Sequence, residues 1–355
     1  MVLPKRTSTS EDVISRVREA IGGDADWRGG RIWSLVYFPG EDVAELIKEA
    51  YAAAIYTNGL GLGAFRSLKK FESEVLAMTA ELVGSSEAVG NMTSGGTESI
   101  IMAVKTARDW ARADKGVTAP EMIVPVSAHP AFDKAGQYLG VRCISIPVTA
   151  DYSADVQAAE RALTANTVLL AGSAPCYPYG KIDPIHELAA LAAQHGVPFH
   201  VDACLGAFVL PFMERLGCDV PPWDFRVAGV SSISADHHKY GYSARGASAI
   251  MYRDKAYRRH QFFTKSDWPG GLYGSPTMAG SRPGGAIAAA WAVMNYLGEE
   301  GYTRLTAITL ETTRKLIDGI KKIKGLRILG SPDMTVLAFT SDGPDIYTVA
   351  DALDV

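Results

Sequence analysis

A glycine-rich segment of this chain has the form of a phosphate-binding site. Residues 94–99, SGGTES, follow an apolar run and open a stretch with helical spacing. Two glycines let the backbone approach a ligand closely, and a helix N-terminus offers free N–H groups and a partial positive charge. The same residues equally suit an ordinary helix cap in which Glu98 closes a capping box. On this segment alone, both interpretations stay open.

His200 and Asp202 end an expected strand, at the carboxyl edge where open α/β sheets bind their ligands. A carboxylate buried at that edge needs a cationic partner or several hydrogen-bond donors. Two residues with this spacing share one strand face, but no third metal ligand at a helpful spacing accompanies them. We therefore expect no metal site.

A lysine follows another expected strand, in the segment 234–241, SADHHKYG. A lone lysine in a loop is usually a solvated surface residue. Lys239, however, stands beside His237, His238 and Tyr240. We expect this crowding to desolvate the amine and to lower its pKa, which would make it a nucleophile toward carbonyl groups.

Together these segments match the needs of one cofactor. Pyridoxal 5'-phosphate requires a phosphate site, an acid beside its pyridine nitrogen and a lysine that forms a Schiff base with it. The glycine-rich segment, Asp202 and Lys239 supply these three groups in turn. His129 opens a further expected helix after a strand and could either stack on the pyridine ring or simply cap that helix. Because the other three groups are present, we favour stacking.

The spacing of apolar residues predicts the elements that position these groups. Expected helices lie at 11–21, 41–55, 65–83, 98–112, 130–139, 154–163, 184–195 and 286–324, the last broken near 298–301. Expected strands lie at 88–93, 122–126, 141–148, 167–172, 198–201, 227–233, 247–252, 327–329 and 335–339. Alternation of strand and helix predicts an α/β fold whose large, mainly parallel sheet is covered on both faces.

The change in pattern along the chain suggests three parts. We expect an N-terminal helical segment at 1–60 and a large cofactor-binding α/β domain at 61–285. The start of a smaller C-terminal α/β domain would occupy 286–355. This last part stops within an expected helix, so we expect the small domain to be incomplete.

Composition limits the class of protein. Of the 355 residues, 47% are apolar and 21% charged, which excludes wholesale disorder. A net charge of -4 argues against a nucleic-acid binder. The four cysteines form no CxxC pair, which favours a reducing cytoplasm, although export into a host cell stays open. No apolar run approaches the roughly 18 residues that a membrane-spanning helix needs, so we expect no transmembrane anchor.

Four segments resemble a known family. They are TSGGTESI at 93–100, PFHVDACLG at 198–206, SISADHHKYG at 232–241 and SPTMAGSRPGG at 275–285. They are similar to the sphingosine-1-phosphate lyases, which are fold-type-I, aminotransferase-like pyridoxal-phosphate enzymes of the group II decarboxylase branch. The resemblance runs from about residue 30 to 347. HKYG alone would equally suit glutamate decarboxylases, whereas the segments at 198–206 and 275–285 favour the lyases.

The resemblance implies roles for the cofactor site. Lys239 would hold pyridoxal phosphate through a Schiff base, Asp202 would pair with the pyridinium nitrogen and His129 would stack on the ring. The residues that would bind the cofactor phosphate are Gly96, Thr97 and His238, joined by Gly274 and Ser275 from the other subunit of a homodimer.

The resemblance also implies a reaction, the retro-aldol cleavage of a phosphorylated sphingoid base between C2 and C3. The products would be a fatty aldehyde and phosphoethanolamine. Tyr37, Asn58 and Arg245 would bind the substrate, and Tyr177 is a catalytic candidate near its reacting end. Lys239, Tyr177 and the cofactor phosphate are alternative bases for the 3-hydroxyl proton. An amino-acid decarboxylase of the glutamate decarboxylase type and a cofactor-binding protein without catalysis are the alternative functions.

The chain also departs from the family pattern. Arg245 stands where a lysine is usual, and it keeps the positive charge and could bind a phosphate through two parallel hydrogen bonds. His237 replaces a usual threonine, and Gly61-Leu62-Gly63 replaces a His-Pro-Asp stretch. The membrane anchor of the eukaryotic members is missing, which suggests a soluble bacterial form.

Overall fold

The computed structural model describes residues 3–32 and 36–353. By its internal contacts the chain divides into two units, Met1–Phe38 and Pro39–Val355. The first unit contains α1 (Ser10–Ile21), which begins where the Thr9 side chain accepts a hydrogen bond from the Asp12 N–H at 3.1 Å. Such a cap satisfies one of the free donors of the first helical turn. The helix expected at 11–21 is confirmed, while the domain boundaries after residues 60 and 285 stay predictions.

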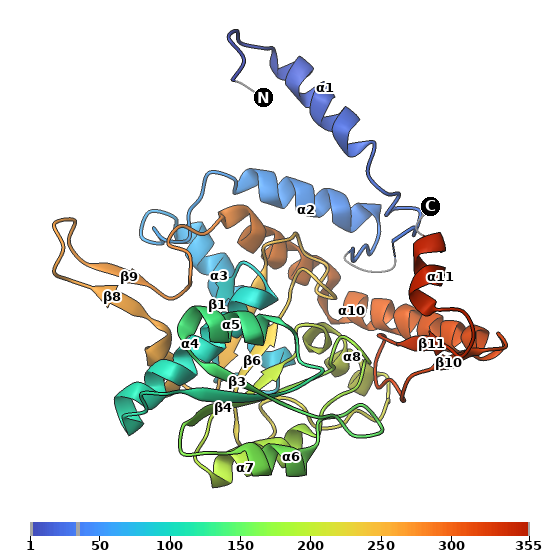
Figure 1. The fold of residues 1–355 in the computed structure, drawn as a ribbon. Coiled ribbons are helices and arrows are strands. Elements are labelled where there is room, and N and C mark those ends of the chain that lie inside the picture. Colours follow the sequence, from blue (N-terminus) through green and yellow to red (C-terminus); the bar gives the residue numbers. More distant parts are fainter. Residues whose placement is uncertain (1–2, 33–35, 354–355) are drawn as a thin grey trace. The chain divides into compact units, whose positions relative to one another are not determined.

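A seven-stranded sheet organises the described part of the second unit (Figure 1). Its order is β1-β7-β6-β5-β4-β2-β3, and neighbours from β6 to β3 are parallel. Only β7 runs against its neighbours, β6 and β1. The strands are β1 (Val89–Thr93), β2 (Glu121–Pro125), β3 (Arg142–Ile146), β4 (Thr167–Ser173), β5 (Phe199–Asp202), β6 (Val230–Ala235) and β7 (Ser248–Tyr252). The predicted α/β fold with a mainly parallel sheet is confirmed.

Helices cover both faces of this sheet. On β4, Leu169 and Ala171 belong to the same buried cluster as Ile101 and Val104 of α4 (Gly96–Lys115). Successive residues of a strand face opposite sides of the sheet. Gly172, next to Ala171, therefore faces the other side and lies against Ile185 at the start of α7 (Ile185–Gln194). Because both faces are covered, the central strands are buried almost throughout: β4 (TVLLAGS) is mainly apolar, whereas β6 (VSSISA) also buries serines.

The remaining elements frame this core. The helices are α2 (Glu41–Ala53), α3 (Arg66–Leu82), α5 (Ala131–Leu139), α6 (Val156–Ala162), α8 (Leu210–Arg215), α9 (Lys255–Arg258), α10 (Gly284–Lys321) and α11 (Ile346–Leu353), with single turns η1 (Gly206–Phe208) and η2 (Arg259–Gln261). The predicted break near 298–301 is confirmed, because Gly298 has non-helical angles inside α10. None of the helices in the described residues has the length and apolar character needed to cross a membrane.

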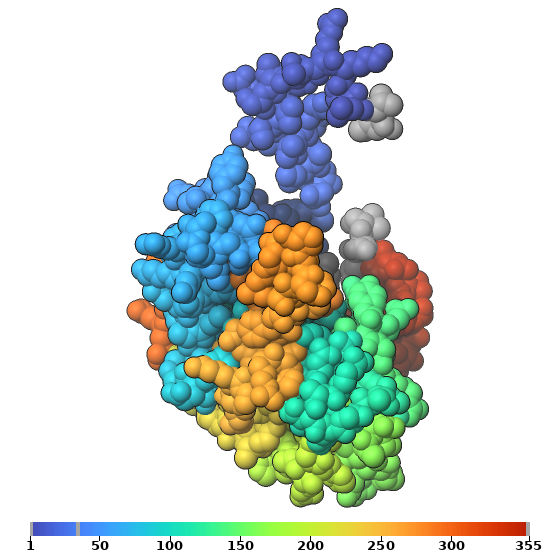
Figure 2. Space-filling view, turned by 90° about the vertical axis from the view of Figure 1, so that its left-hand side faces the viewer, coloured from blue at the N-terminus to red at the C-terminus, as the bar shows by residue number. Residues whose placement is uncertain are grey.

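Two small sheets complete the fold. One pairs β10 (Leu326–Ile328) with β11 (Phe339–Ser341), so the strand expected at 335–339 begins later than predicted. The other is a hairpin of β8 (Phe263–Lys265) and β9 (Tyr273–Ser275), which the sequence analysis missed because each strand has only three residues. This segment, orange in Figure 2, lies on the surface. Several of its large apolar side chains are exposed, namely Phe262, Phe263, Trp268 and Leu272.

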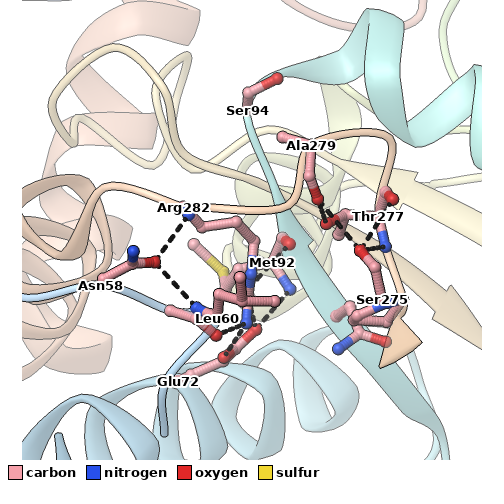
Figure 3. Close-up of polar contacts among 12 residues, drawn as sticks. Asn58, Leu60, Glu72, Met92, Ser94, Ser275, Thr277, Ala279 and Arg282 are labelled. Atoms are coloured by element: carbon pink, nitrogen blue, oxygen red, sulfur yellow. Dashed lines mark hydrogen bonds and ion pairs between the residues drawn. The ribbon is translucent and has the colours of Figure 1, made fainter. Parts of the chain in front are cut away.

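A buried ion pair closes the free edge of the sheet beside β1. Glu72 of α3 and Arg282 face each other through two contacts, of 2.5 and 2.9 Å, with side chains 6% and 9% exposed (Figure 3). Met92 of β1 donates its N–H to Glu72 and accepts from Arg282 through its carbonyl oxygen. Arg282 also donates to the carbonyl of Gly59. The pair therefore joins four separate segments of the chain, those that carry Gly59, Glu72, Met92 and Arg282.

We predict that Arg282→Ala lowers the free energy of unfolding by about 3–5 kcal/mol, because it leaves the Glu72 carboxylate buried without its cation. Lys315→Ala, which breaks the exposed pair between Lys315 and Glu311 on α10, is the control and should change stability little. Chemical denaturation followed by circular dichroism measures both. Equal, small effects for the two variants would contradict the structural importance of the buried pair.

Candidate active site

A cavity of about 270 Å³ lies where the carboxyl ends of β5 and β6 meet the N-terminus of α4. It collects much of the predicted cofactor site: its lining includes Gly96, Thr97, His129, Asp202, His238 and Lys239. Further residues line it as well, among them Glu98, Cys204 and Asp236.

Strand geometry explains why distant residues converge here. Asp202 is the last residue of β5 and pairs in register with Ser234 of β6. Because parallel strands end at one edge of the sheet, the turn that follows β6 brings Lys239 to the same place as Asp202. β1 also ends there and leads through Gly95 into α4.

Asp202 is buried and remains ionised. Its Oδ1 accepts hydrogen bonds from the Cys204 N–H at 3.1 Å and from the Ser234 hydroxyl at 3.0 Å. Burial raises the pKa of Asp202, but the charge of Lys239 and the hydrogen bonds from Cys204 lower it by more, so the pKa lies below its usual range. The site thus holds a fixed negative charge at this strand end.

The environment of Lys239 corrects one expectation. Burial lowers the pKa of Lys239, whereas Cys204, Asp236 and Asp202 raise it by more, so the pKa lies above its usual value rather than below it. Burial also raises the pKa of the Cys204 thiol well above its usual value, which keeps that thiol neutral near pH 7. The charges that hold the lysine protonated are therefore the two carboxylates.

His237 does not crowd the lysine as expected. Its Nε2 shares a hydrogen bond of 2.9 Å with Thr79 on α3, and its ring packs edge-on against Phe208 at 5.0 Å between centroids. Burial lowers the pKa of His237 to about 3, so the ring is neutral. The two adjacent side chains thus point to different places: His238 lines the cavity, whereas His237 is buried in the core.

Features of both interpretations of the glycine-rich segment are present. Glu98, in the first turn of α4, accepts the Ser94 N–H at 2.7 Å and the Ser94 hydroxyl at 2.6 Å, as in a capping box. Its other oxygen accepts the Met278 N–H at 2.8 Å. Gly96 and Thr97 nevertheless line the cavity, so the start of α4 still faces a space that a phosphate could occupy.

His129 likewise combines its two expected positions. Its Nδ1 accepts the Ala131 N–H at 3.1 Å, which caps the start of α5. The residue also lines the cavity, where a ring could stack on a planar ligand. One hydrogen bond therefore fixes the side chain beside the place where stacking was expected.

The structure does not bring the remaining predicted residues into this cavity. Arg245 is exposed and donates to the carbonyl oxygen of His238 at 2.6 Å, while Tyr177 is 54% exposed. Asn58 binds Ser281 and accepts the N–H groups of Leu60 and Arg282. Their predicted roles remain untested.

The two residues expected to act on the other subunit are also outside the cavity. Ser275 donates to the carbonyl oxygens of Thr277 and Ala279 in its own turn, as Figure 3 shows, and Gly274 is exposed on β9. Tyr37 belongs to the first unit of the chain, and its role as a substrate-binding residue stays a prediction.

A match to a protein-family model shows which family the chain belongs to. The model of the pyridoxal-dependent decarboxylase conserved domain matches residues 4–341. The chain belongs to the pyridoxal-dependent decarboxylase family. Its fold is the fold-type-I arrangement that the sequence analysis expected.

Several members of this family are similar over nearly the whole chain. Sphingosine-1-phosphate lyase of Arabidopsis thaliana is 48% identical, over 96% of this chain and 64% of that protein. The structure of sphingosine-1-phosphate lyase from Burkholderia pseudomallei K96243 is 41% identical with a TM-score of 0.96, and the match covers 99% of this chain and 83% of that one. Glutamate decarboxylase of Lactobacillus brevis shares the fold, with a TM-score of 0.84 at 20% identity. The chain spans just under two thirds of the length of the Arabidopsis lyase.

Pyridoxal phosphate fits the groups around the cavity. A helix N-terminus with two glycines, an ionised aspartate and a lysine stand at its wall, as the family's cofactor requires. Among the described residues, Asp236 Oδ1 and His238 Nδ1 are buried without a hydrogen-bond partner. Buried polar atoms are nearly always satisfied, so these two atoms favour a polar ligand in the cavity. The described residues contain no cluster of histidine, cysteine or carboxylate side chains suited to a metal ion.

We predict that borohydride reduction of the purified protein attaches pyridoxal phosphate irreversibly to Lys239, because this amine stands between the start of α4 and Asp202. Peptide mapping by mass spectrometry locates the label. Lys265 on the exposed hairpin serves as an internal control and should remain unlabelled. A label on another lysine, or none, would show that the cofactor is held elsewhere.

Proposed function

We propose that this protein is a pyridoxal-phosphate-dependent lyase that cleaves phosphorylated sphingoid bases, such as sphingosine 1-phosphate, between C2 and C3. The products are a fatty aldehyde and phosphoethanolamine. The observation that carries the proposal is the 41% identity and 0.96 TM-score to a bacterial sphingosine-1-phosphate lyase across 99% of the chain. The cavity supports it, because an amine, a carboxylate and a helix N-terminus converge there.

The cofactor site divides into three tasks. Lys239 holds the cofactor covalently, and Gly96, Thr97 and His238 bind its phosphate at the start of α4. His129, fixed by its hydrogen bond to Ala131, would stack on the cofactor ring. When bound, pyridoxal phosphate supplies an electron sink for the electron pair that remains when a substrate bond breaks.

Asp202 controls the charge of this site. Its carboxylate is held in place by Cys204 and Ser234 and stays ionised at neutral pH. In this state it would hold a proton on the pyridine nitrogen and stabilise the positive charge there. Because this charge is already fixed in a buried position, it can stabilise the pyridinium without any rearrangement of solvent.

The substrate's own phosphate requires a second cationic group. Arg245 is suited to this task because its guanidinium is exposed, while its hydrogen bond to the His238 carbonyl ties it to the loop that carries Lys239. A guanidinium binds phosphate strongly through paired hydrogen bonds. Tyr37 and Asn58 assist in substrate binding, and Tyr177 remains a candidate base together with Lys239.

A homodimer completes the site in this proposal. Gly274 and Ser275 lie on β9, within a surface hairpin that exposes several large apolar side chains. A second copy that covers these side chains would bring the hairpin's turn to the cofactor phosphate of its partner. A cytoplasmic location stays a prediction from the cysteine pattern.

We predict that the purified protein with its cofactor converts sphingosine 1-phosphate into a fatty aldehyde and phosphoethanolamine in equal amounts. Mass spectrometry of both products tests this. Release of carbon dioxide from glutamate or aspartate, without aldehyde from the phosphorylated base, would favour the decarboxylase alternative. The 34% identity to a probable L-aspartate decarboxylase of Thermococcus gammatolerans makes aspartate the first amino acid to try.

We further predict that Arg245→Ala raises KM for the phosphorylated base by roughly tenfold or more, the loss expected for one charge-assisted contact. It should leave the visible absorption of the bound cofactor unchanged and cost little with the unphosphorylated base. Arg327→Ala, at another exposed arginine, is the matched control. Equal losses for both substrates, or loss of the cofactor, would place Arg245 at the wrong phosphate.

A further inference from the structure

Asp236 is a buried carboxylate of the cavity to which the sequence analysis gave no role. Its side chain is 1% exposed, and its Oδ2 lies 3.1 Å from Lys239 Nζ and 3.6 Å from His238 Nε2. Its Oδ1 has no hydrogen-bond partner within the described chain. A buried charge with so few donors depends on its cation, here the lysine.

The backbone builds this ion pair. After β6 ends at Ala235, the chain turns, and the Lys239 N–H donates to the carbonyl oxygen of Asp236 at 3.3 Å. Residues three apart in such a turn face the same side. The start of α4 closes the other side, because a Cβ on Gly96 would lie 2.7 Å from Asp236 Oδ2. Asp236 therefore has little freedom to move away from the amine.

We propose that Asp236 is the counter-ion that holds the ammonium of Lys239 in the cofactor-free protein, and that this ion pair must open before pyridoxal phosphate is captured. The proposal rests on the proposed function of Lys239 as the attachment point. Asp236 acts through the lysine and is a positioning residue.

Capture requires a proton to leave first. An ammonium has no lone pair, so Lys239 must release one proton to solvent before its nitrogen attacks the aldehyde carbon. The nitrogen then forms a double bond to the aldehyde carbon, and the aldehyde oxygen leaves as water. The two protons of this water come from the amine and from solvent. The pH decides whether the imine nitrogen that remains is protonated. No electrons are exchanged with any further reactant.

The groups around the lysine all bear on this step. The ionisable residues that line the cavity with it are Asp236 and His238 from its own loop, Asp202 and Cys204 from the end of β5, Glu98 from α4 and His129 from before α5. Burial lowers the pKa of Lys239, and the neighbouring acidic groups raise it by more. Capture should therefore be slow near neutral pH and accelerate as the pH rises.

Asp236→Asn tests the ion pair, because it keeps the side chain's size and removes its charge. Competitive labelling of the full-length, cofactor-free chain with an amine-reactive reagent, read by mass spectrometry across a pH series, measures the pKa of Lys239. We expect the variant to lower this pKa by about 1–3 units, the usual effect of one close opposite charge. Asp202→Asn should lower it less, because Asp202 is hydrogen-bonded to Cys204 and Ser234. Asp267→Asn, on the exposed hairpin, should not change it.

The rate of cofactor capture is the second readout. Absorbance after mixing with pyridoxal phosphate should show a rate that rises with pH in the wild type. In Asp236→Asn the profile should move to lower pH, with capture near pH 7 faster by about tenfold for each unit of lowered pKa. A merely structural residue would slow capture without moving the profile.

Several results would overturn the proposal. An unchanged labelling profile in folded Asp236→Asn would do so, as would a wild-type Lys239 that titrates at or below an ordinary lysine. The wild-type measurement needs no variant, so it decides even if Asp236→Asn does not fold. Labelling also needs no cofactor. Attachment of pyridoxal phosphate to another lysine, with the predicted shift at Lys239, would refute the proposed function but not the ion pair.

Discussion

The buried pair of Glu72 and Arg282 is the constraint from which the arrangement of the site follows. β1 is an edge strand, and its outer N–H and C=O groups at Met92 have no strand to bind. The ion pair takes the place of that strand. Because the strand then runs directly into Gly95 and α4, the same pair fixes the start of the helix that faces the cavity. It also fixes the segment that leads from the hairpin into α10.

The charges of the site are balanced between Lys239 and the carboxylates beside it. Two buried carboxylates, Asp202 and Asp236, both raise the pKa of a single lysine, Lys239. Asp202 is supported by fixed donors, whereas Asp236 depends on the lysine itself. The two carboxylates therefore respond differently when the lysine loses its charge.

Much of this could be predicted from sequence. Local patterns gave the strands and helices, and the rule that parallel strands end at one edge grouped Gly96, Asp202 and Lys239 correctly. The sign of the pKa shift of Lys239 was wrong because Asp202 and Asp236, which the fold brings beside the amine, outweigh burial, and because His237 lies in the core instead of beside the lysine. The pair of Glu72 and Arg282 was missed because 210 residues separate its members and only the fold brings them together. Asp236 could have been found from its position three residues before the lysine.

Glu98 links two regions that differ in their exposure to solvent. One of its oxygens holds Ser94 at the start of α4, and the other holds the N–H of Met278, just beyond the surface hairpin. A single rigid carboxylate thus couples the hairpin mechanically to the rim of the cavity. If the segment around Met278 shifts, Glu98 loses a donor in a place where water has little access, and the first turn of α4 must readjust. A change at the exposed segment beside the hairpin would therefore reach the wall of the cavity through the side chain of Glu98.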